Sequence, residues 1–258
     1  MLAKGFFLKY NWIVIQSSNL CRKDVIFIAR RYDKEDAKRR ILSVCVRCFI
    51  EKGYRAARLA DIMQQADVTS SSFHHIFPTK DAVLLELAEF MFDNQFGIAS
   101  QIVREATSPI RLYAVETAIQ MTLAELNENL REIYVEAYTQ PKIAEYIYQK
   151  TSAVLQTIFR KYLPDCSEGD FYELEIGSAG IMRAYMARPC DKYFTLSRKL
   201  ERFLSMSLKA YCVPDDEIEQ VLTYLRNTDM VALANQAMQE LFAALAMKFD
   251  FTLEQAVP

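Results

Sequence analysis

A short run of hydroxyl and imidazole side chains is the most chemically distinctive part of this 258-residue sequence. Residues 69–75 read Thr-Ser-Ser-Ser-Phe-His-His. These polar side chains are compact, they donate and accept hydrogen bonds, and no acid lies among them. Such groups suit close approach to the base edges and phosphate oxygens of a nucleic acid. The residue types therefore indicate DNA contact as the chemistry of this segment.

The periodicity of the flanking sequence predicts how the segment is held. Apolar residues recur at helical spacing over residues 37–49, and Gly53 can adopt the left-handed conformation that ends a helix. A second short helix is expected over residues 59–66 and, after a tight turn, a third over residues 70–76. Two short helices joined by a tight turn are typical of a helix-turn-helix, whose second helix enters the DNA major groove.

We expect the exposed side of the third helix to face the DNA, with basic residues nearby that reach phosphates. Thr79 is a suitable N-cap for the following helix, and Asp81 is favourable in its first turn. On spacing alone, an ordinary helical subdomain with a serine-rich loop remains an alternative. The predicted DNA-binding residues are Arg58, Thr69, Ser70, Ser71, Ser72, His74, His75 and Lys80.

Further positions in the same block form a recognisable pattern. An Ile-Leu pair stands early in the first helix, Val-Thr follows the turn, and Phe-Pro-Thr-Lys-Asp leads into a long helix. With these features the block from residue 37 to 87, about a fifth of the chain, resembles the N-terminal domain of the TetR family of bacterial transcriptional repressors. The positions that carry the resemblance are Ile41, Leu42, Phe49, Gly53, Tyr54, Leu59, Ile62, Val68, Thr69, Phe73, His74, His75, Phe77, Pro78, Thr79, Lys80 and Asp81.

The chain departs from the family pattern at a few of these places. Ala57 and Arg58 replace the Thr or Ser that opens the second helix, so a side-chain cap is lost, although Arg58 can still meet a phosphate. Asp67 replaces a glycine in the turn, and aspartate tolerates turn conformations. Ser71 replaces a glycine, and His74 replaces the tyrosine that touches the DNA backbone in the family. These changes affect the expected operator sequence more than the fold.

The resemblance implies a homodimer that binds double-stranded DNA at a palindromic site and responds to a small-molecule effector. By that analogy the candidates for the dimer contact are the helices Gly169–Met186 and Thr195–Tyr211, although packing within the chain explains their small residues equally well. The implied function is that of a repressor in the bacterial cytoplasm, released from its operator when the effector binds. Effector-binding residues cannot be carried over, because these bodies diverge in sequence, and no cofactor is implied.

The distribution of charge agrees with DNA binding. Residues 22–85 carry 13 Lys and Arg against 8 Asp and Glu, whereas residues 86–258 carry 16 against 25. A basic N-terminal part on an acidic remainder is what a phosphate-binding module joined to a non-DNA domain should show. The small overall net charge of −2 conceals this division.

Long segments with a 3.6-residue period fill the rest of the chain, and prolines mark the breaks between them. The predicted fold is all-α, with an N-terminal three-helix helix-turn-helix DNA-binding domain joined by a long helix to a larger helical effector-binding and dimerisation domain. We divide the chain into an extension (1–32), the DNA-binding domain (33–94) and the ligand-binding and dimerisation domain (95–258). The helices expected after the third are 81–106, 109–126, 130–138, 143–162, 169–186, 195–211, 215–227 and 230–249.

Residues 1–32 lie outside the resemblance, and we expect low order there. The segment Val25–Ile28 fits either a short strand or a helical lead-in. No uninterrupted apolar run in the extension is long enough to span a membrane, so no membrane partner is expected.

Catalysis has little support in the sequence. Both histidines lie on the proposed recognition helix, and neither a P-loop nor a dinucleotide fingerprint is present. Glu173 and Glu175 fall in helical sequence and are interpreted as solvent-facing acids. Cys45 and Cys48 have the spacing of half a zinc site, but they lie on the apolar side of a helix, so we interpret them as core residues. We therefore expect no enzymatic activity.

Two alternatives to an effector-released repressor remain open. One is a helix-turn-helix protein whose helical body binds a protein partner rather than a small ligand. The other is an all-α enzyme that begins with a basic subdomain. The many tyrosines of the body fit an apolar pocket with a few polar groups, although helix packing explains most of them individually. An enclosed pocket would favour a small ligand, and a solid core with an exposed apolar patch would favour a protein partner.

Overall fold

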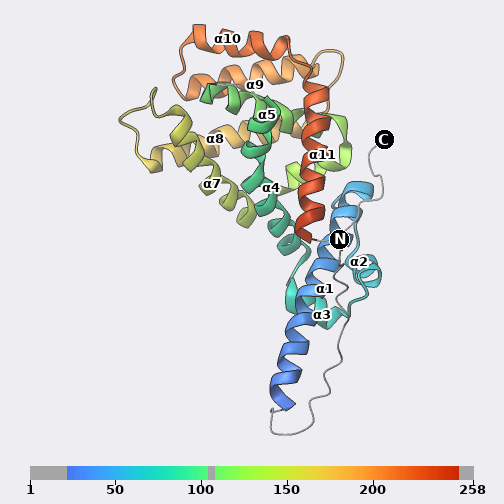
Figure 1. Ribbon diagram of the computed structural model, residues 1–258. Coiled ribbons are helices and arrows are strands. Elements are labelled where there is room, and N and C mark those ends of the chain that lie inside the picture. Colours follow the sequence, from blue (N-terminus) through green and yellow to red (C-terminus); the bar gives the residue numbers. More distant parts are fainter. Residues whose placement is uncertain (1–21, 104–107, 250–258) are drawn as a thin grey trace, which may run out of the picture. The chain divides into compact units, whose positions relative to one another are not determined.

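The computed structural model of the chain describes residues 22–103 and 108–249, and all regular elements in these ranges are helices (Figure 1). The all-α prediction is confirmed. Among the described residues, no helix combines the length and the apolar character needed to cross a bilayer. The helices are α1 (Arg22–Lys52), α2 (Leu59–Gln65), α3 (Ser70–Ile76), α4 (Lys80–Val103), α5 (Pro109–Leu126), α6 (Glu128–Ala137), α7 (Pro141–Phe159), α8 (Glu168–Ala187), α9 (Leu196–Ala210), α10 (Asp215–Arg226) and α11 (Met230–Phe249).

The chain divides into two compact units, residues 1–36 and residues 37–258. In the first unit α1 begins at Arg22, so residues 22–32 are helical, and Val25–Ile28 is part of that helix rather than a strand. The expectation for residues 1–21 lies outside the described residues. Within the second unit, "head" below means residues 37–94, and "body" means the described residues from 95 to 249.

The helices of the head pack around one small apolar core. Cys45 and Phe49 of α1, Ile62 of α2 and Phe73 of α3 are all buried. Cys48, next to Phe49, is buried as well, so both cysteines are core residues as interpreted from the sequence. The core holds the two short helices α2 and α3 against α1, because each can bury its apolar side only against the others.

Side-chain N-caps lie at the start of α5 and of α8, where the sequence predicts breaks between helices. Ser108 accepts a hydrogen bond from the Arg111 amide, and Pro109 occupies the first turn of α5. Ser167 and Asp170 form a reciprocal capping box at the start of α8. α5 and α11 have the predicted bounds, and the other body helices begin and end within a few residues of the predicted positions.

α5 is the central helix of the body. Nearly all of its residues are buried, and it contacts α4 and every helix from α6 to α11. α11 lies along α4 and α5 and closes one side of this arrangement (Figure 1). A helix enclosed on all sides is normally apolar all round. α5 departs from that rule, because Glu116 and Gln120 are among its buried residues.

The interpretation of Glu175 as a solvent-facing acid was wrong. Glu175 of α8 is buried, whereas Glu173 is exposed as expected. Glu175 follows Phe171 by four positions and precedes Ala179 by four, and both of these residues are buried. Its place on the apolar stripe of α8 therefore carries the carboxyl group into the body.

A buried ion pair ties α9 to α5. Lys199 is 1% exposed, and its ammonium donates to the Glu125 carboxylate at 2.8 Å and to the Arg188 carbonyl at 2.6 Å. The other carboxylate oxygen of Glu125 accepts from the Cys190 amide at 2.9 Å. Burial raises the pKa of Glu125, but the bonds from Lys199 and Cys190 outweigh it, and the pKa falls below its usual value. This pair fixes the segment between α8 and α9 against α5.

Candidate nucleic-acid interface

The third helix, α3, presents short polar side chains to solvent and one aromatic ring to the core. Ser70, Ser71, His74 and His75 are exposed, and Phe73 is fully buried. The hydroxyls of Ser70 and Ser71 have no hydrogen bond within the described part of the chain. These groups are therefore available to accept and donate bonds at a DNA surface.

Thr69 fixes the start of α3. Its hydroxyl oxygen accepts from the Ser72 amide at 3.1 Å and donates to the Ser72 hydroxyl at 3.0 Å. An N-cap of this kind satisfies one of the free amides of the first turn, and it holds the helix in a defined orientation. Thr69 and Ser72 are both exposed, but their hydroxyls are engaged with each other.

The ring of His74 is oriented from within the head. Its Nδ1 lies 3.1 Å from the Pro78 carbonyl oxygen, and its ring packs edge-on against Phe73 with 5.5 Å between centroids. A bond to a carbonyl requires the hydrogen on Nδ1, so the neutral ring offers Nε2 as an acceptor. Only the protonated imidazolium donates from Nε2, which is the form that a phosphate contact needs.

The turn between α2 and α3 has the geometry that its sequence suggests. Asp67 has a φ of +50°, which is the left-handed conformation of a turn residue. Arg40 of α1 donates to the carbonyls of Ala66 and Asp67 at 2.7 and 3.0 Å. This bracing role for Arg40 was not predicted. No local sequence pattern indicates it, because Ala66 and Asp67 follow Arg40 by 26 and 27 residues.

The two basic residues predicted to reach phosphates differ in their surroundings. Arg58 is exposed at the N-cap position of α2, makes no side-chain cap, and has no ion pair among the described residues. Lys80 instead donates to the carbonyls of Tyr54 and Ala57 at 2.8 and 3.1 Å, and it lies 4.3 Å from the Tyr54 ring centroid. Its ammonium is engaged inside the head, so a structural role replaces phosphate binding as our interpretation of Lys80.

The end of α1 is bonded to α6 of the body. The Asn129 amide donates to the Ile50 carbonyl at 2.7 Å, and Arg55 pairs with Glu132 and Glu136 at 3.5 and 3.4 Å. Gly53 lies between these contacts with a φ of +85°. A Cβ at this position would meet the side chains of Glu132 and Asn129. The glycine is therefore needed both for its conformation and for the close approach of α6.

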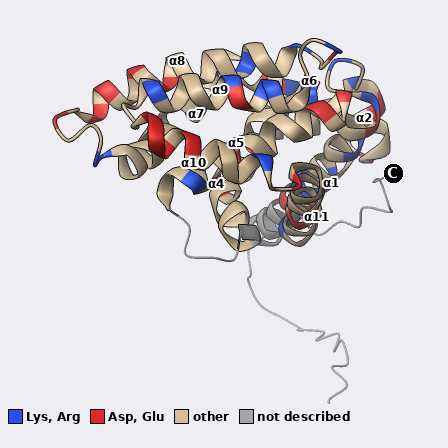
Figure 2. Cartoon of the chain, turned by 90° about the horizontal axis from the view of Figure 1, so that it is seen from above, with Lys and Arg blue, Asp and Glu red and all other residues tan. Residues whose placement is uncertain are grey.

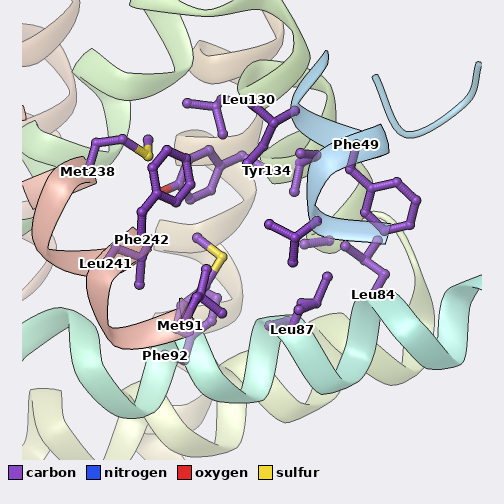
Figure 3. A pocket seen from close by; sticks show the side chains of 16 residues that line it. Phe49, Leu84, Leu87, Met91, Phe92, Leu130, Tyr134, Met238, Leu241 and Phe242 are labelled. Atoms are coloured by element: carbon purple, nitrogen blue, oxygen red, sulfur yellow. The ribbon is translucent and has the colours of Figure 1, made fainter. Parts of the chain in front are cut away.

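An apolar cavity lies beside this contact, between α1, α4, α6 and α11 (Figure 3). Its enclosed space is about 60 Å³, within about 690 Å³ of space between atoms that includes open solvent. All its lining side chains are aliphatic, aromatic or thioether, among them Phe49, Met91, Leu130, Tyr134 and Phe242. Such a lining fits the apolar portion of a small ligand.

One face of α8 exposes small and apolar residues. Ile176 is 41% exposed and Ile181 36%, and Gly177 and Gly180 lie beside them. Figure 2 marks the charged residues along the ribbon of the body, including the acidic first turn of α10. An exposed stripe of this composition allows another helix to approach closely.

Comparison with known proteins places the head in a described family. Residues 41–87 match the model for bacterial regulatory proteins of the tetR family, which confirms the resemblance. The HTH-type transcriptional regulator YuxN of Bacillus subtilis is 26% identical over 98 residues, 38% of this chain and 32% of the relative. The HTH-type transcriptional repressor KstR2 of Mycolicibacterium smegmatis is 32% identical over 70 residues, 27% of this chain and 34% of the relative. The chain thus spans about a third of the length of these curated relatives.

Two crystal structures of a gamma-butyrolactone receptor (ArpA-like protein) are similar over most of the chain. The TM-score is 0.43 and the identity 15% in both, over 81% and 80% of this chain and 99% of the receptor.

Proposed function

We propose that this chain, which carries a TetR family DNA-binding domain, is a transcriptional repressor that leaves its operator when a small molecule occupies the body. The observation that supports it best is α3, whose exposed face consists of hydroxyl and imidazole groups on a helix fixed by the Thr69 cap and the braced turn. The residues proposed to meet DNA are Arg58, Thr69, Ser70, Ser71, Ser72, His74 and His75. The protein would act in the cytoplasm, and no catalytic role is proposed.

The domain division is part of the same proposal. We place the DNA-binding domain at residues 33–94 and the ligand-binding and dimerisation domain at residues 95–258. The helix α4 passes through this boundary and makes contact with α5, α6, α7 and α11 of the body. It therefore joins the two parts as one continuous element.

The partner proposed for the exposed face of α8 is a second copy of the chain. Ile176 and Ile181 would be buried against the same face of the copy, with Gly177 and Gly180 permitting close approach. A dimer would place two α3 helices about 34 Å apart, which matches one turn of DNA and an inverted repeat. Occupancy of the body would change the separation of the two heads, so that both no longer fit their half-sites.

The proposal of a small ligand over a protein partner rests on the cavity of Figure 3, which offers an apolar space between the head and the body. The word repressor in the name of KstR2 agrees with the direction of regulation, but that relative matches only about a third of its own length.

Selection from a pool of random duplexes with the full-length chain tests DNA binding. We expect enrichment of an inverted repeat, and an affinity that falls steeply with salt because phosphate contacts release counterions. Ser71→Glu, which places a charge toward phosphates on an exposed position, should weaken binding at least tenfold. Ser100→Glu, on an exposed position of α4, is the matched control and should bind as wild type. No enrichment, or equal binding by the Ser71 variant, would contradict the proposal.

The dimer is tested by sedimentation equilibrium of Ile176→Arg. We expect this variant to be a monomer with an unchanged far-ultraviolet circular dichroism spectrum and with operator affinity reduced at least tenfold. A wild-type protein that binds its selected site as a strict monomer would refute the dimeric arrangement.

A further inference from the structure

Two buried carboxyl groups face one cavity in the middle of the body. Glu116 of α5 and Glu175 of α8 are each 5% exposed, and both line a cavity formed by α4, α5, α6, α7 and α8. Glu116 accepts a hydrogen bond from the Gln120 amide. Neither glutamate forms an ion pair with a lysine, arginine or histidine in the described part of the chain. Two buried acids without a counter-charge are costly to ionise, and a cation beside them would remove that cost.

The same cavity holds two further polar groups without hydrogen-bond partners. Gln120, also 5% exposed, uses its amide nitrogen on Glu116 and on Gln95, the latter at 3.0 Å. Its carbonyl oxygen has no hydrogen-bond partner among the described residues, and neither does the hydroxyl of Thr151. Both residues line the cavity. The cavity therefore presents a surplus of oxygen atoms, and a ligand with positively charged nitrogen would satisfy them.

Aromatic rings complete the wall around the carboxyl groups. Phe92, Phe96, Tyr113 and Tyr138 line the same cavity. The Tyr113 hydroxyl is engaged with the Ser207 hydroxyl at 2.5 Å, so the ring rather than the oxygen is its contribution here. Aromatic faces attract ammonium groups through their quadrupoles, most strongly where water is excluded. Carboxylates together with aromatic rings form an environment that favours an organic cation over an anion.

The polar cavity and the apolar cavity of Figure 3 each share lining residues with a third cavity. An intermediate cavity is lined by Glu116 and Gln120 at one end and by Met91, Tyr134 and Leu241 at the other. Met91, Tyr134 and Leu241 also line the apolar cavity. These three side chains lie between the site with acidic oxygens and the apolar site, so a ligand that occupies both must displace them. The occupant of both sites should therefore be amphipathic, with its charged end at α5 and α8.

We propose that the effector is an organic cation with an apolar tail, its nitrogen held between Glu116 and Glu175 and its tail directed along α11 toward the head. This inference rests on the proposed function, and it names the chemical class of the ligand. The cation supplies the counter-charge that the two carboxyl groups lack. The tail reaches the cavity between α1 and α6, where the head and the body are bonded to each other.

Isothermal titration of the full-length chain, without DNA, tests the site. The probes are decylammonium and decyltrimethylammonium below their micelle concentrations, with decanol and decanoate as a neutral and an anionic probe of the same chain length. We expect the two cations to bind at least tenfold more tightly than decanol, and decanoate to bind more weakly than decanol. Equal affinities, or no binding by either cation, would overturn the proposal.

Variants locate the site. Glu116→Gln and Glu175→Gln together should lower the affinity for decyltrimethylammonium at least tenfold and leave that for decanol unchanged. Glu173→Gln, two residues away on the exposed side of α8, is the matched control and should bind as wild type. Tight binding of the cation by the double variant would refute the assignment of the cation site to Glu116 and Glu175.

The same titration separates this inference from the proposed function. If the cations bind at the two glutamates but do not release the selected DNA, the cation site is confirmed and effector-released repression is refuted. If DNA is bound and released by a molecule without positive charge while neither cation binds, the repressor stands and the cation site is wrong.

Discussion

The substitution Glu175→Gln should stabilise the protein, and the gain should grow with pH. Burial, together with the charge of Glu116, raises the pKa of Glu175 from its ordinary value of 4.5 to about 8. Glutamine has the shape of the protonated carboxyl group and never ionises. The variant therefore removes the ionisation of this position while it keeps the packing of α8 against α5.

The magnitude follows from the pKa difference between the folded and the unfolded chain. A raised folded pKa means that the folded state holds its proton more tightly, so the stability from the neutral acid is complete below about pH 4.5 and is lost as the pH rises through about 8. Each pKa unit corresponds to about 1.4 kcal/mol. The penalty for Glu175 is then about 2 kcal/mol at pH 6 and about 5 kcal/mol at pH 9. The advantage of the variant should increase by about 3 kcal/mol over this interval.

Other titrating groups do not obscure this comparison. Burial also raises the pKa of Glu116, to about 7, but Glu116 is present in both proteins. The tyrosines around the pair stay neutral in this range, because burial raises their pKa values above 10; they are Tyr113, Tyr134, Tyr138 and Tyr211. The pH dependence of the difference between variant and wild type therefore comes from the ionisation of Glu175 and from its interaction with Glu116.

Urea unfolding followed by circular dichroism at pH 6, 7.5 and 9, at one protein concentration, measures the effect. Glu173→Gln serves as the control, because this exposed position should give a small difference that does not change with pH. A Glu175→Gln difference that stays constant from pH 6 to pH 9, or a variant less stable than wild type at pH 9, would refute the burial argument.

Three further outcomes are expected. Gly53→Ala should destabilise the fold by about 1–3 kcal/mol in thermal unfolding, because it combines a positive φ with contact against α6, whereas Gly97→Ala in an open part of α4 should be neutral or stabilising by up to about 1 kcal/mol. Glu125→Gln should cost about 3 kcal/mol in urea unfolding, since it leaves the buried Lys199 ammonium without a counter-charge; a loss below about 1 kcal/mol would show that the pair is dispensable. Arg58→Ala should lower the slope of log affinity against log salt by about one for the selected DNA and leave unfolding unchanged, and an unaltered slope would exclude a phosphate contact by this residue.

The helical framework was predictable from the sequence because its signals are local. The helix α3 is Ser70–Ile76 in both the prediction and the structure, and Pro109 and Ser108 fix the start of α5. Such boundaries depend on capping and on the period of apolar residues, which involve neighbours within one or two turns. The left-handed turn at Asp67 was predictable for the same reason.

The surroundings of individual polar groups were not predictable, because they depend on partners far along the chain. Lys80 was expected at a phosphate, but it bonds carbonyls 23 and 26 residues earlier. Glu175 was expected in solvent, although its four-residue spacing from Phe171 and Ala179 did carry the signal of burial. Nothing in the sequence indicated that Glu116 and Glu175 share one cavity, since only the packing of α5 against α8 brings them together.

The position of α6 has a consequence for the concentration at which such a protein would respond. This helix bonds the end of α1 through Asn129, and it also lines the apolar cavity through Leu130 and Tyr134. If α6 couples the head to the apolar cavity, effector binding and DNA binding are linked. Linkage then requires operator DNA to weaken effector binding by the same factor by which the effector weakens DNA binding. Copies of the protein that are not bound to DNA would then bind the effector at lower effector concentrations than the DNA-bound copies. The amount of protein in the cell, and not affinity alone, would therefore set the threshold at which the operator is vacated.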